Sequence, residues 1–283
     1  MTERTYVRGS CHALNGCQVF DFGVADLRAL RRRLHAEPLF SFHAPLPTPE
    51  SYPGQSSTSY LLDPDPDKRH ATMEMLRRTV NLAAQWGAQY VVAHFGGLHS
   101  EGLSRREVLK LAYDAAAQLN ALSLEQGVPV HIEYAAYNPS YSGPHELADL
   151  VAGYEGLHVC LDLGHARIGA RMLGLDEWEV YETLAPHTQS MHLWTLRHQE
   201  DVRRYRHTPV HPTLTPSGGW IDVPQVLDLV LRHNPACDLV FEWDSIYEPD
   251  PGWQAEGEAW VRQLVAAYRG RPAPPSAVGS GSS

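Results

Sequence analysis

The sequence predicts an α/β protein that folds as a (β/α)8 barrel, slightly irregular at its first βα unit. Short apolar segments alternate with segments of helical periodicity along most of the 283 residues. The apolar segments are nearly continuous, which is typical of parallel strands covered on both faces. The length fits one such barrel, so we expect residues 1–270 to form a single domain. The expected strands are residues 5–9, 18–22, 39–43, 89–94, 129–134, 158–162, 189–194 and 238–242.

Helical patterns occupy most of the segments between these strands. Residues 67–86, for example, place their apolar side chains on one face of a helix. Ser104 followed by Glu107 three residues later is a capping-box pattern, which marks the start of another helix. The expected helices are residues 24–36, 67–86, 104–126, 144–151, 176–184, 223–233 and 254–269.

Several segments depart from a regular barrel. Residues 10–17 are too few for a full helix between the first two strands. Two long segments, residues 45–66 and 196–221, each follow the C-terminal end of a strand, so we expect both to fold over that end of the barrel. Residues 271–283 consist mostly of Pro, Ala, Gly and Ser, and we expect them to be a disordered tail.

The composition narrows the class of protein. A hydrophobic content of 43% is enough for a full core, and no apolar run of about 18 residues predicts a membrane span. The N-terminus carries charges and no apolar core of a secretory signal, so we expect a cytoplasmic protein. The four cysteines form no CxxC pair and are interpreted as free thiols. A net charge of −10 gives no general attraction to nucleic acid.

Six of the expected strands end on, or just before, a residue that can bind a metal ion. In a barrel of parallel strands all these ends meet at one mouth, where such enzymes carry their active sites. Imidazole and carboxylate groups that converge on one point are typical of a site for a first-row divalent cation. The residues are His43, His94, Glu133, Asp162 with His165, His192 and Glu242.

Glu133, Asp162, His192 and Glu242 are the main candidate ligands, because four different strands supply three carboxylates and one imidazole. Carboxylates on neighbouring strand ends repel one another unless a cation lies between them. Each residue alone could equally pair with an arginine or cap a helix. The set of four favours a metal site.

Four histidines form a second layer of candidates. His43, His94 and His165 are either further ligands or hydrogen-bonded histidines, and the two interpretations are both open at each position. His165 follows Asp162 closely enough to point back into the mouth. His211, in the segment 196–221, is a further candidate ligand.

Glu133 and Glu242 are expected on opposite sides of the mouth, where they can address opposite faces of one substrate carbon. With a cation that polarises a neighbouring carbonyl, one carboxylate can remove a proton from that carbon. The same geometry can instead hold two or three metal ions that activate water against a phosphodiester. Proton transfer and phosphodiester hydrolysis are therefore two separate hypotheses.

Aromatic and basic residues near the strand ends are candidate substrate contacts. Phe42, Trp194, Trp220 and Trp243 can line a pocket for a small polar substrate such as a sugar, or can be ordinary packing. Arg206, in the arginine-rich part of the segment 196–221, can hold a phosphate or belong to a solvated loop.

Five sequence motifs resemble the xylose isomerase-like TIM-barrel superfamily, which includes sugar isomerases and epimerases, inosose dehydratases and endonuclease IV. The resemblance covers about residues 18 to 268. The motifs are FHAP at 42–45, AAQWGAQYVVAHFGG at 83–97, CLDLGHA at 160–166, MHL at 191–193 and the stretch 211–222, which ends in GWID.

In epimerase-like members of this superfamily, one divalent metal is held by residues that match Glu133, Asp162, His192 and Glu242. The resemblance implies that the two glutamates form the catalytic acid–base pair and that His165 contacts the substrate. It therefore implies a metal-dependent sugar or polyol-ketone isomerase or epimerase that abstracts a proton next to a carbonyl. The expected cofactor is Mn, Zn, Co or Mg.

Endonuclease IV-like members hold three zinc ions and add histidines that match His43, His94, His165 and His211. They also use an aspartate two residues before the last of these, where this sequence has Pro209, which cannot ligate. The alternative function is thus a metal-dependent phosphodiesterase on abasic DNA. Pro209 and the acidic charge argue against it, and a non-catalytic sugar- or metal-binding barrel is a third class.

Overall fold

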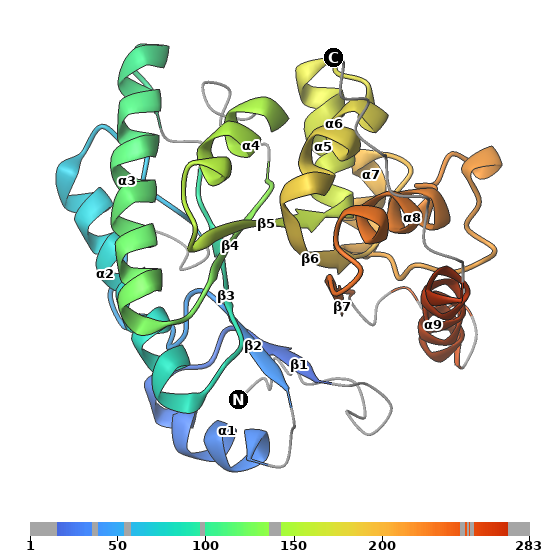
Figure 1. Cartoon of the computed structure of the whole chain (residues 1–283), viewed down its shortest axis with the longest axis horizontal. Coiled ribbons are helices and arrows are strands. Elements are labelled where there is room, and N and C mark those ends of the chain that lie inside the picture. Colours follow the sequence, from blue (N-terminus) through green and yellow to red (C-terminus); the bar gives the residue numbers. More distant parts are fainter. Residues whose placement is uncertain are drawn as a thin grey trace, which may run out of the picture.

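Seven parallel strands form one sheet in the order β1 to β7, which curves into a nearly closed barrel (Figure 1). The computed structural model describes residues 16–35, 39–53, 58–96, 100–135, 143–243, 247, 249 and 252–270. The predicted parallel barrel is confirmed, and the expected strand 5–9 lies outside the described residues. The strands are β1 Cys17–Val19, β2 Phe40–His43, β3 Val91–His94, β4 Val130–Glu133, β5 Leu157–Asp162, β6 Thr188–Leu193 and β7 Asp238–Phe241.

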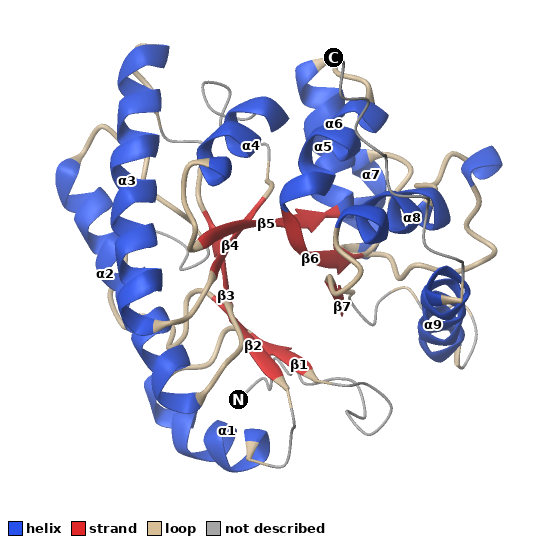
Figure 2. Cartoon of the chain, in the orientation of Figure 1, coloured by secondary structure: helices blue, strands red, loops and turns tan. Residues whose placement is uncertain are grey.

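The helices surround the strands on the outside of the barrel (Figure 2). The α-helices are α1 Leu27–Leu34, α2 Pro66–Trp86, α3 Arg105–Gln126, α4 Pro144–Ala152, α5 Leu163–Leu173, α6 Glu177–Leu184, α7 Gln199–Tyr205, α8 Val223–His233 and α9 Trp253–Arg269. Short 3-10 turns are η2 Val24–Asp26, η3 Ala185–His187 and η4 Pro216–Gly218.

Local sequence signals set the helix ends. The predicted capping box of α3 is present, because Ser104 and Glu107 bond each other's backbone N–H groups. At the far end of α3, Gly127 has a φ of 65°, a left-handed conformation that glycine adopts without steric cost. All seven predicted helices are found, with ends shifted by no more than a few residues.

Two helices were not predicted. α5 begins directly after β5, with no loop between them, and its sequence contains two glycines, which lower the intrinsic helix propensity. α7 lies inside the long segment 196–221, where the sequence has no clear apolar periodicity. The predicted disordered tail, 271–283, lies outside the described residues.

Strand register brings the candidate ligands to one end of the barrel. His94 pairs with Glu133 across β3 and β4, and Asp162 pairs with His192 across β5 and β6. Because successive side chains of a strand point to opposite faces, His43 and Ser41 face the barrel interior and Phe42 faces the helices. The ring of Phe42 indeed lies 5.7 Å from the ring of Trp86 on α2.

No helix in the described ranges is long and apolar enough to cross a membrane. Cys17, Cys160 and Cys237 are free thiols, as expected, whereas Cys11 lies outside the described residues.

Candidate metal centre

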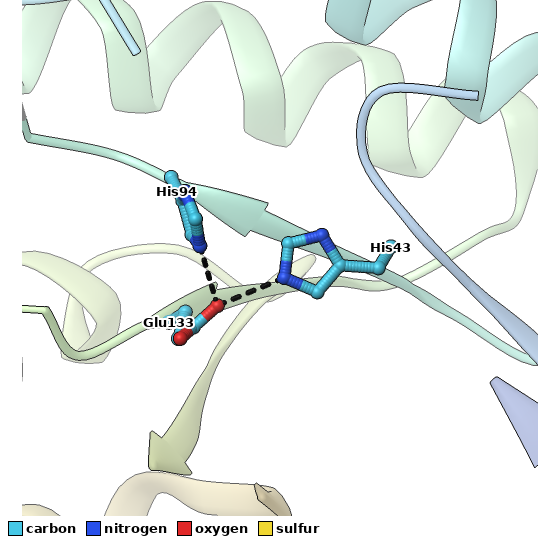
Figure 3. Close-up of side chains that lie close together, drawn as sticks. All are labelled: His43, His94 and Glu133. Atoms are coloured by element: carbon cyan, nitrogen blue, oxygen red, sulfur yellow. Dashed lines mark hydrogen bonds and ion pairs between the residues drawn. The ribbon is translucent and has the colours of Figure 1, made fainter. Parts of the chain in front are cut away.

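Glu133, at the end of β4, lies at the centre of the candidate site and is 4% exposed. Its Oε2 atom is 2.9 Å from His43 Nε2 and 2.8 Å from His94 Nε2 (Figure 3). His43 Nδ1 lies 2.9 Å from the carbonyl oxygen of Ala44, which can only accept, so Nδ1 carries a proton. His43 Nε2 therefore faces the carboxylate either as a second N–H donor or through a cation that both groups share.

Two groups of side chains bring potential ligand atoms within 4.8 Å of one another among the described residues. The first ligand group is Glu133, Asp162, His192 and Glu242, as the sequence predicted. The second ligand group is His43, His94 and Glu133. Glu133 belongs to both groups and turns one carboxylate oxygen toward each: Oε2 toward His43 and His94, and Oε1 toward His192, whose Nδ1 is 3.9 Å away.

The first ligand group is arranged around His192 Nδ1. This nitrogen lies 2.9 Å from Glu242 Oε2 and 3.6 Å from Asp162 Oδ2. Yet both ring nitrogens of His192 and Glu242 Oε2 are buried without a hydrogen-bond partner among the described residues. Buried polar atoms without partners are costly, and a cation shared by His192 Nδ1 and Glu242 Oε2 would satisfy these two atoms together. The three carboxylates and one imidazole therefore fit a divalent metal ion in both geometry and donor type.

Asp162 is held in place from two directions. Its Oδ1 accepts a hydrogen bond of 2.7 Å from the backbone N–H of His165, so it caps the N-terminus of α5. Its Oδ2 accepts one of 2.7 Å from the indole N–H of Trp194. A hydrogen-bonded neighbour of this kind orients a metal-binding carboxylate.

Trp194 reaches Asp162 only because residue 164 is a glycine. A Cβ atom on Gly164 would lie 2.1 Å from the Trp194 ring, closer than any contact allows. Trp194 itself is 0% exposed. The indole thus supports Asp162, and the expectation that this ring also lines a substrate pocket stays a prediction.

The charges of the site support one another. Burial alone would raise the pKa of Glu133, but His94 and His43 hold it well below its usual value. Burial would also raise the pKa of Glu242, but the charges of His192 and His207 lower it below its usual value. For His192 the effect of burial is to lower the pKa, but Cys160 and Glu242 raise it well above its usual value. The neighbouring histidines therefore favour the carboxylate form of both glutamates.

Two further histidines behave differently from each other. His165 Nε2 lies 3.5 Å from Glu133 Oε1, so His165 is at the mouth as predicted. His211 is not brought to either ligand group. Its Nδ1 lies 2.9 Å from Thr213 Oγ1, its Nε2 lies 3.3 Å from Glu256 Oε2, and its ring stacks on Trp253 of α9 at 3.6 Å.

The remaining predicted contacts lie around the site rather than in it. Phe42 faces the helices and packs against Trp86, away from both ligand groups, and its contact with substrate stays a prediction. Trp220 is 8% exposed and lines a pocket of about 290 Å³ beside α5, α6 and α8, with the Arg197 guanidinium 4.8 Å above its ring. Trp243 is half-buried and packs on Phe241. Arg206 is exposed at the end of α7.

One further histidine lies close to the first ligand group. His207 Nδ1 lies 3.8 Å from Glu242 Oε1. Nothing in the local sequence places this histidine at the mouth, because the course of the segment 196–221 cannot be read from its composition.

Comparison with solved structures shows the fold of the chain. It matches the apo form of 3-keto-D-glucoside 4-epimerase YcjR from E. coli at 15% identity and a TM-score of 0.61, covering 88% of this chain and 98% of that one. It matches an L-ribulose 3-epimerase at 14% identity and a TM-score of 0.63, covering 89% and 84%. A xylose isomerase-like TIM barrel protein from Mycobacterium smegmatis in complex with magnesium matches at 16% identity and a TM-score of 0.60, covering 87% and 80%.

Comparison with curated proteins gives no match. A family model described as xylose isomerase-like TIM barrel matches residues 10–264. This match spans most of the sequence and includes every residue of both ligand groups. The chain therefore belongs to the xylose isomerase-like TIM barrel family.

Proposed function

We propose that this protein is a metal-dependent sugar isomerase or epimerase that moves a proton to or from a carbon next to a carbonyl. The observation that carries the proposal is the first ligand group, in which two glutamates, a buried imidazole and a buried aspartate bring their ligand atoms together at the mouth. The names of the similar structures, a 3-keto-D-glucoside 4-epimerase and an L-ribulose 3-epimerase, favour a sugar as the substrate.

Glu133, Asp162, His192 and Glu242 would hold the ion, and the mixed oxygen and nitrogen set suits Mn, Zn, Co or Mg. A divalent ion supplies Lewis-acid polarisation of a substrate carbonyl, which acidifies the neighbouring C–H bond. The protein's own contribution is to place carboxylates beside that bond and to keep them ionised.

The two glutamates differ in what they can offer. Glu242 has a side chain that is 27% exposed, and its Oε2 faces His192 while its Oε1 lies on the side of His207. One oxygen of Glu242 can therefore serve as ligand while the other takes a proton from substrate. The Glu133 side chain is only 2% exposed, and His43 and His94 both contact its Oε2. Glu242 is thus the better placed base, and we assign Glu133 Oε1 the role of partner, which returns a proton to the carbon only after it has first taken one up.

His165 completes the proposed catalytic set. Its side chain is 14% exposed and its Nε2 lies 3.5 Å from Glu133 Oε1, so it can donate a hydrogen bond to a substrate oxygen beside that carboxylate.

The test is exchange of substrate C–H hydrogen with deuterium from solvent, followed by NMR over a set of ketoses and inososes with the metal-loaded protein. We expect exchange in at least one substrate and a loss of about 10²–10⁴ in rate for Glu242→Gln, with most metal binding retained. Glu125→Gln, on the exposed side of α3, is the matched control and should exchange at the normal rate. Turnover without exchange would reject proton abstraction, and full exchange in Glu242→Gln would remove its role as base.

The second ligand group supports one alternative. His43, His94 and Glu133 could hold a second ion, and a pair of ions would supply activation of water for hydrolysis of a phosphodiester. The contact of His211 with Glu256 of α9, away from both ligand groups, and the net charge of −10 argue against an endonuclease IV-like enzyme. Incision of abasic duplex DNA that requires metal and is lost in Glu242→Gln would favour this alternative over the first proposal.

A further inference from the structure

His207 is held at the mouth by an unusual course of the chain. The chain leaves β6, passes through α7 and returns beside the end of β6, where Thr195 and Thr208 form an antiparallel bridge. In this bridge the backbone N–H of Thr195 donates to the carbonyl oxygen of Thr208 over 2.8 Å. The preceding residue, Arg206, has a φ of 55°, which is costly for a residue with a side chain. Strain of this kind persists where the surrounding structure fixes it, and it is common beside functional sites.

The imidazole of His207 rests on the same support as a candidate metal ligand. Its ring stacks on the Trp194 ring at 4.2 Å and 17°, and the Trp194 indole donates to Asp162. The ring of His165 meets it edge-on at 6.2 Å. Trp194 thus positions Asp162 with its nitrogen and His207 with its face.

The Nδ1 atom of His207 is buried and has no hydrogen-bond partner among the described residues. Glu242 Oε1 lies 3.8 Å from it, which is too far for a hydrogen bond. The side chain as a whole is 23% exposed, so part of the ring is open to solvent. A buried nitrogen held in place without a partner is costly unless a ligand supplies one.

The geometry does not favour His207 as a metal ligand. The two groups whose ligand atoms lie within 4.8 Å of one another do not include it, although the described part of the chain covers both His207 and its neighbours. His207 instead faces Glu242 Oε1, the oxygen that points away from His192. A single oxygen atom can lie about 2.8 Å from each of two atoms that are themselves 3.8 Å apart.

We propose that His207 is a substrate-contacting residue that hydrogen-bonds, through Nδ1, a hydroxyl on the carbon adjacent to the one that Glu242 deprotonates. This inference rests on the proposed function and narrows its substrate class. The protein should select polyhydroxylated ketoses with an oxygen at that adjacent carbon and discriminate against the corresponding deoxy compounds. A site built around a hydrogen bond rejects an analogue without the hydroxyl because its own polar atom is then left unpaired.

The test compares the ketose that exchanges fastest with its analogue lacking the adjacent hydroxyl. His207→Phe keeps a ring on Trp194 but removes Nδ1, and His207→Asn returns a polar atom near the same place. We expect His207→Phe to lower kcat/KM for the full ketose about tenfold, the size of one hydrogen bond, and to leave the deoxy analogue nearly unchanged. His207→Asn should recover most of the loss, and His233→Phe, on the exposed end of α8, should behave as wild type.

An equal loss of kcat/KM for the full ketose and for its deoxy analogue would overturn the proposal, because His207 would then contribute only packing and no hydrogen bond to the hydroxyl. A tenfold loss of Mn²⁺ affinity in His207→Asn would also overturn it, in favour of a role as ligand. If no ketose exchanges in the wild type, the proposed function fails, and binding of ribitol and sorbitol to the metal-loaded protein decides the role of His207. If His207→Phe binds the alditols more weakly than wild type, the role of His207 as a substrate contact is supported. If both proteins bind them equally, or neither binds them, that role is rejected.

Discussion

The two sides of the barrel mouth hold their polar residues in different ways. On the side of β5 to β7, Asp162 and His192 are 0% exposed, and Trp194 and the N-terminus of α5 bond Asp162. On the side of β2 and β3, the ligand candidates are histidines alone, and the His94 side chain is 24% exposed. Glu133 lies between the sides and joins them. The first side is thus organised in advance for a cation, and the second depends on the carboxylate of Glu133.

The largest expected effect comes from the residue that both sides share. Glu133→Gln keeps the size of the side chain but removes its charge, so both ligand groups lose a carboxylate. We expect affinity for Mn²⁺ to fall about 100-fold or more, measured by isothermal titration calorimetry. Glu125→Gln should bind the ion normally. Loss of less than tenfold would mean that Glu133 is a hydrogen-bond partner of the two histidines and not a ligand.

Protons and metal ions should compete at His192. Its pKa is raised above the usual 6.5, so the metal-free protein gains stability from the protonated imidazole below about that pH and loses it as the pH rises through the raised value. The lowered pKa of Glu133 contributes above about 4.5 and is lost as the pH falls through the lowered value. Without metal, the two groups together therefore stabilise the fold most between about pH 4.5 and about pH 6.5.

Metal binding should show the opposite trend, because the ion requires neutral His192. We expect affinity for Mn²⁺ to fall about tenfold for each pH unit below the raised pKa of His192, together with release of a proton on binding. Thermal unfolding with and without Mn²⁺ across pH 5 to 8 measures both effects, since roughly this range spans the titration of an imidazole. An affinity that does not change with pH would exclude His192 as a ligand.

A smaller effect is expected from the support behind Asp162. Trp194→Phe keeps a ring in place but removes the indole N–H that donates to Asp162. Affinity for Mn²⁺ should fall about tenfold, which is typical of the loss of a partner behind a ligand. Trp178→Phe is the matched control, because it removes an indole hydrogen bond of the same length, to Glu182 on the surface of α6. If both variants bind alike, Trp194 does not organise the site.

The smallest effect is expected on the histidine side. His94→Gln removes a member of the second ligand group only, and Glu133 keeps its contact with His43. The tightest binding of Mn²⁺ should change less than about threefold, while any weaker second binding event should disappear. A loss as large as that of Glu133→Gln would show that the two sides form one site.

Much of the fold and the site was readable from the sequence because the signals are local. Apolar strands end abruptly in polar residues, and parallel strands bring those ends together, so the first ligand group follows from strand order alone. The direction of Phe42 was also readable, since a neighbour of an inward-facing His43 must face outward. The prediction overlooked this alternation.

Other features depend on contacts that are distant in the sequence. Trp194 meets Asp162 because Gly164 leaves room for the indole, and neither the glycine nor the tryptophan signals this alone. His211 turns to Trp253 on α9, where Gly257 lets the backbone of Val210 approach closely. The same course of the chain brings His207 to the mouth. These placements follow from tertiary packing, which local sequence patterns do not encode.

We expect Glu133, Asp162, His192 and Glu242 to bind one divalent ion together at the barrel mouth. Anomalous diffraction at the manganese edge, from crystals grown with Mn²⁺, locates the ion without reference to activity. We expect the strongest peak to lie among these four side chains, with Glu242 Oε1 left facing His207. A strongest peak elsewhere on the chain, or none at the mouth in protein that binds Mn²⁺ in solution, would contradict the claim.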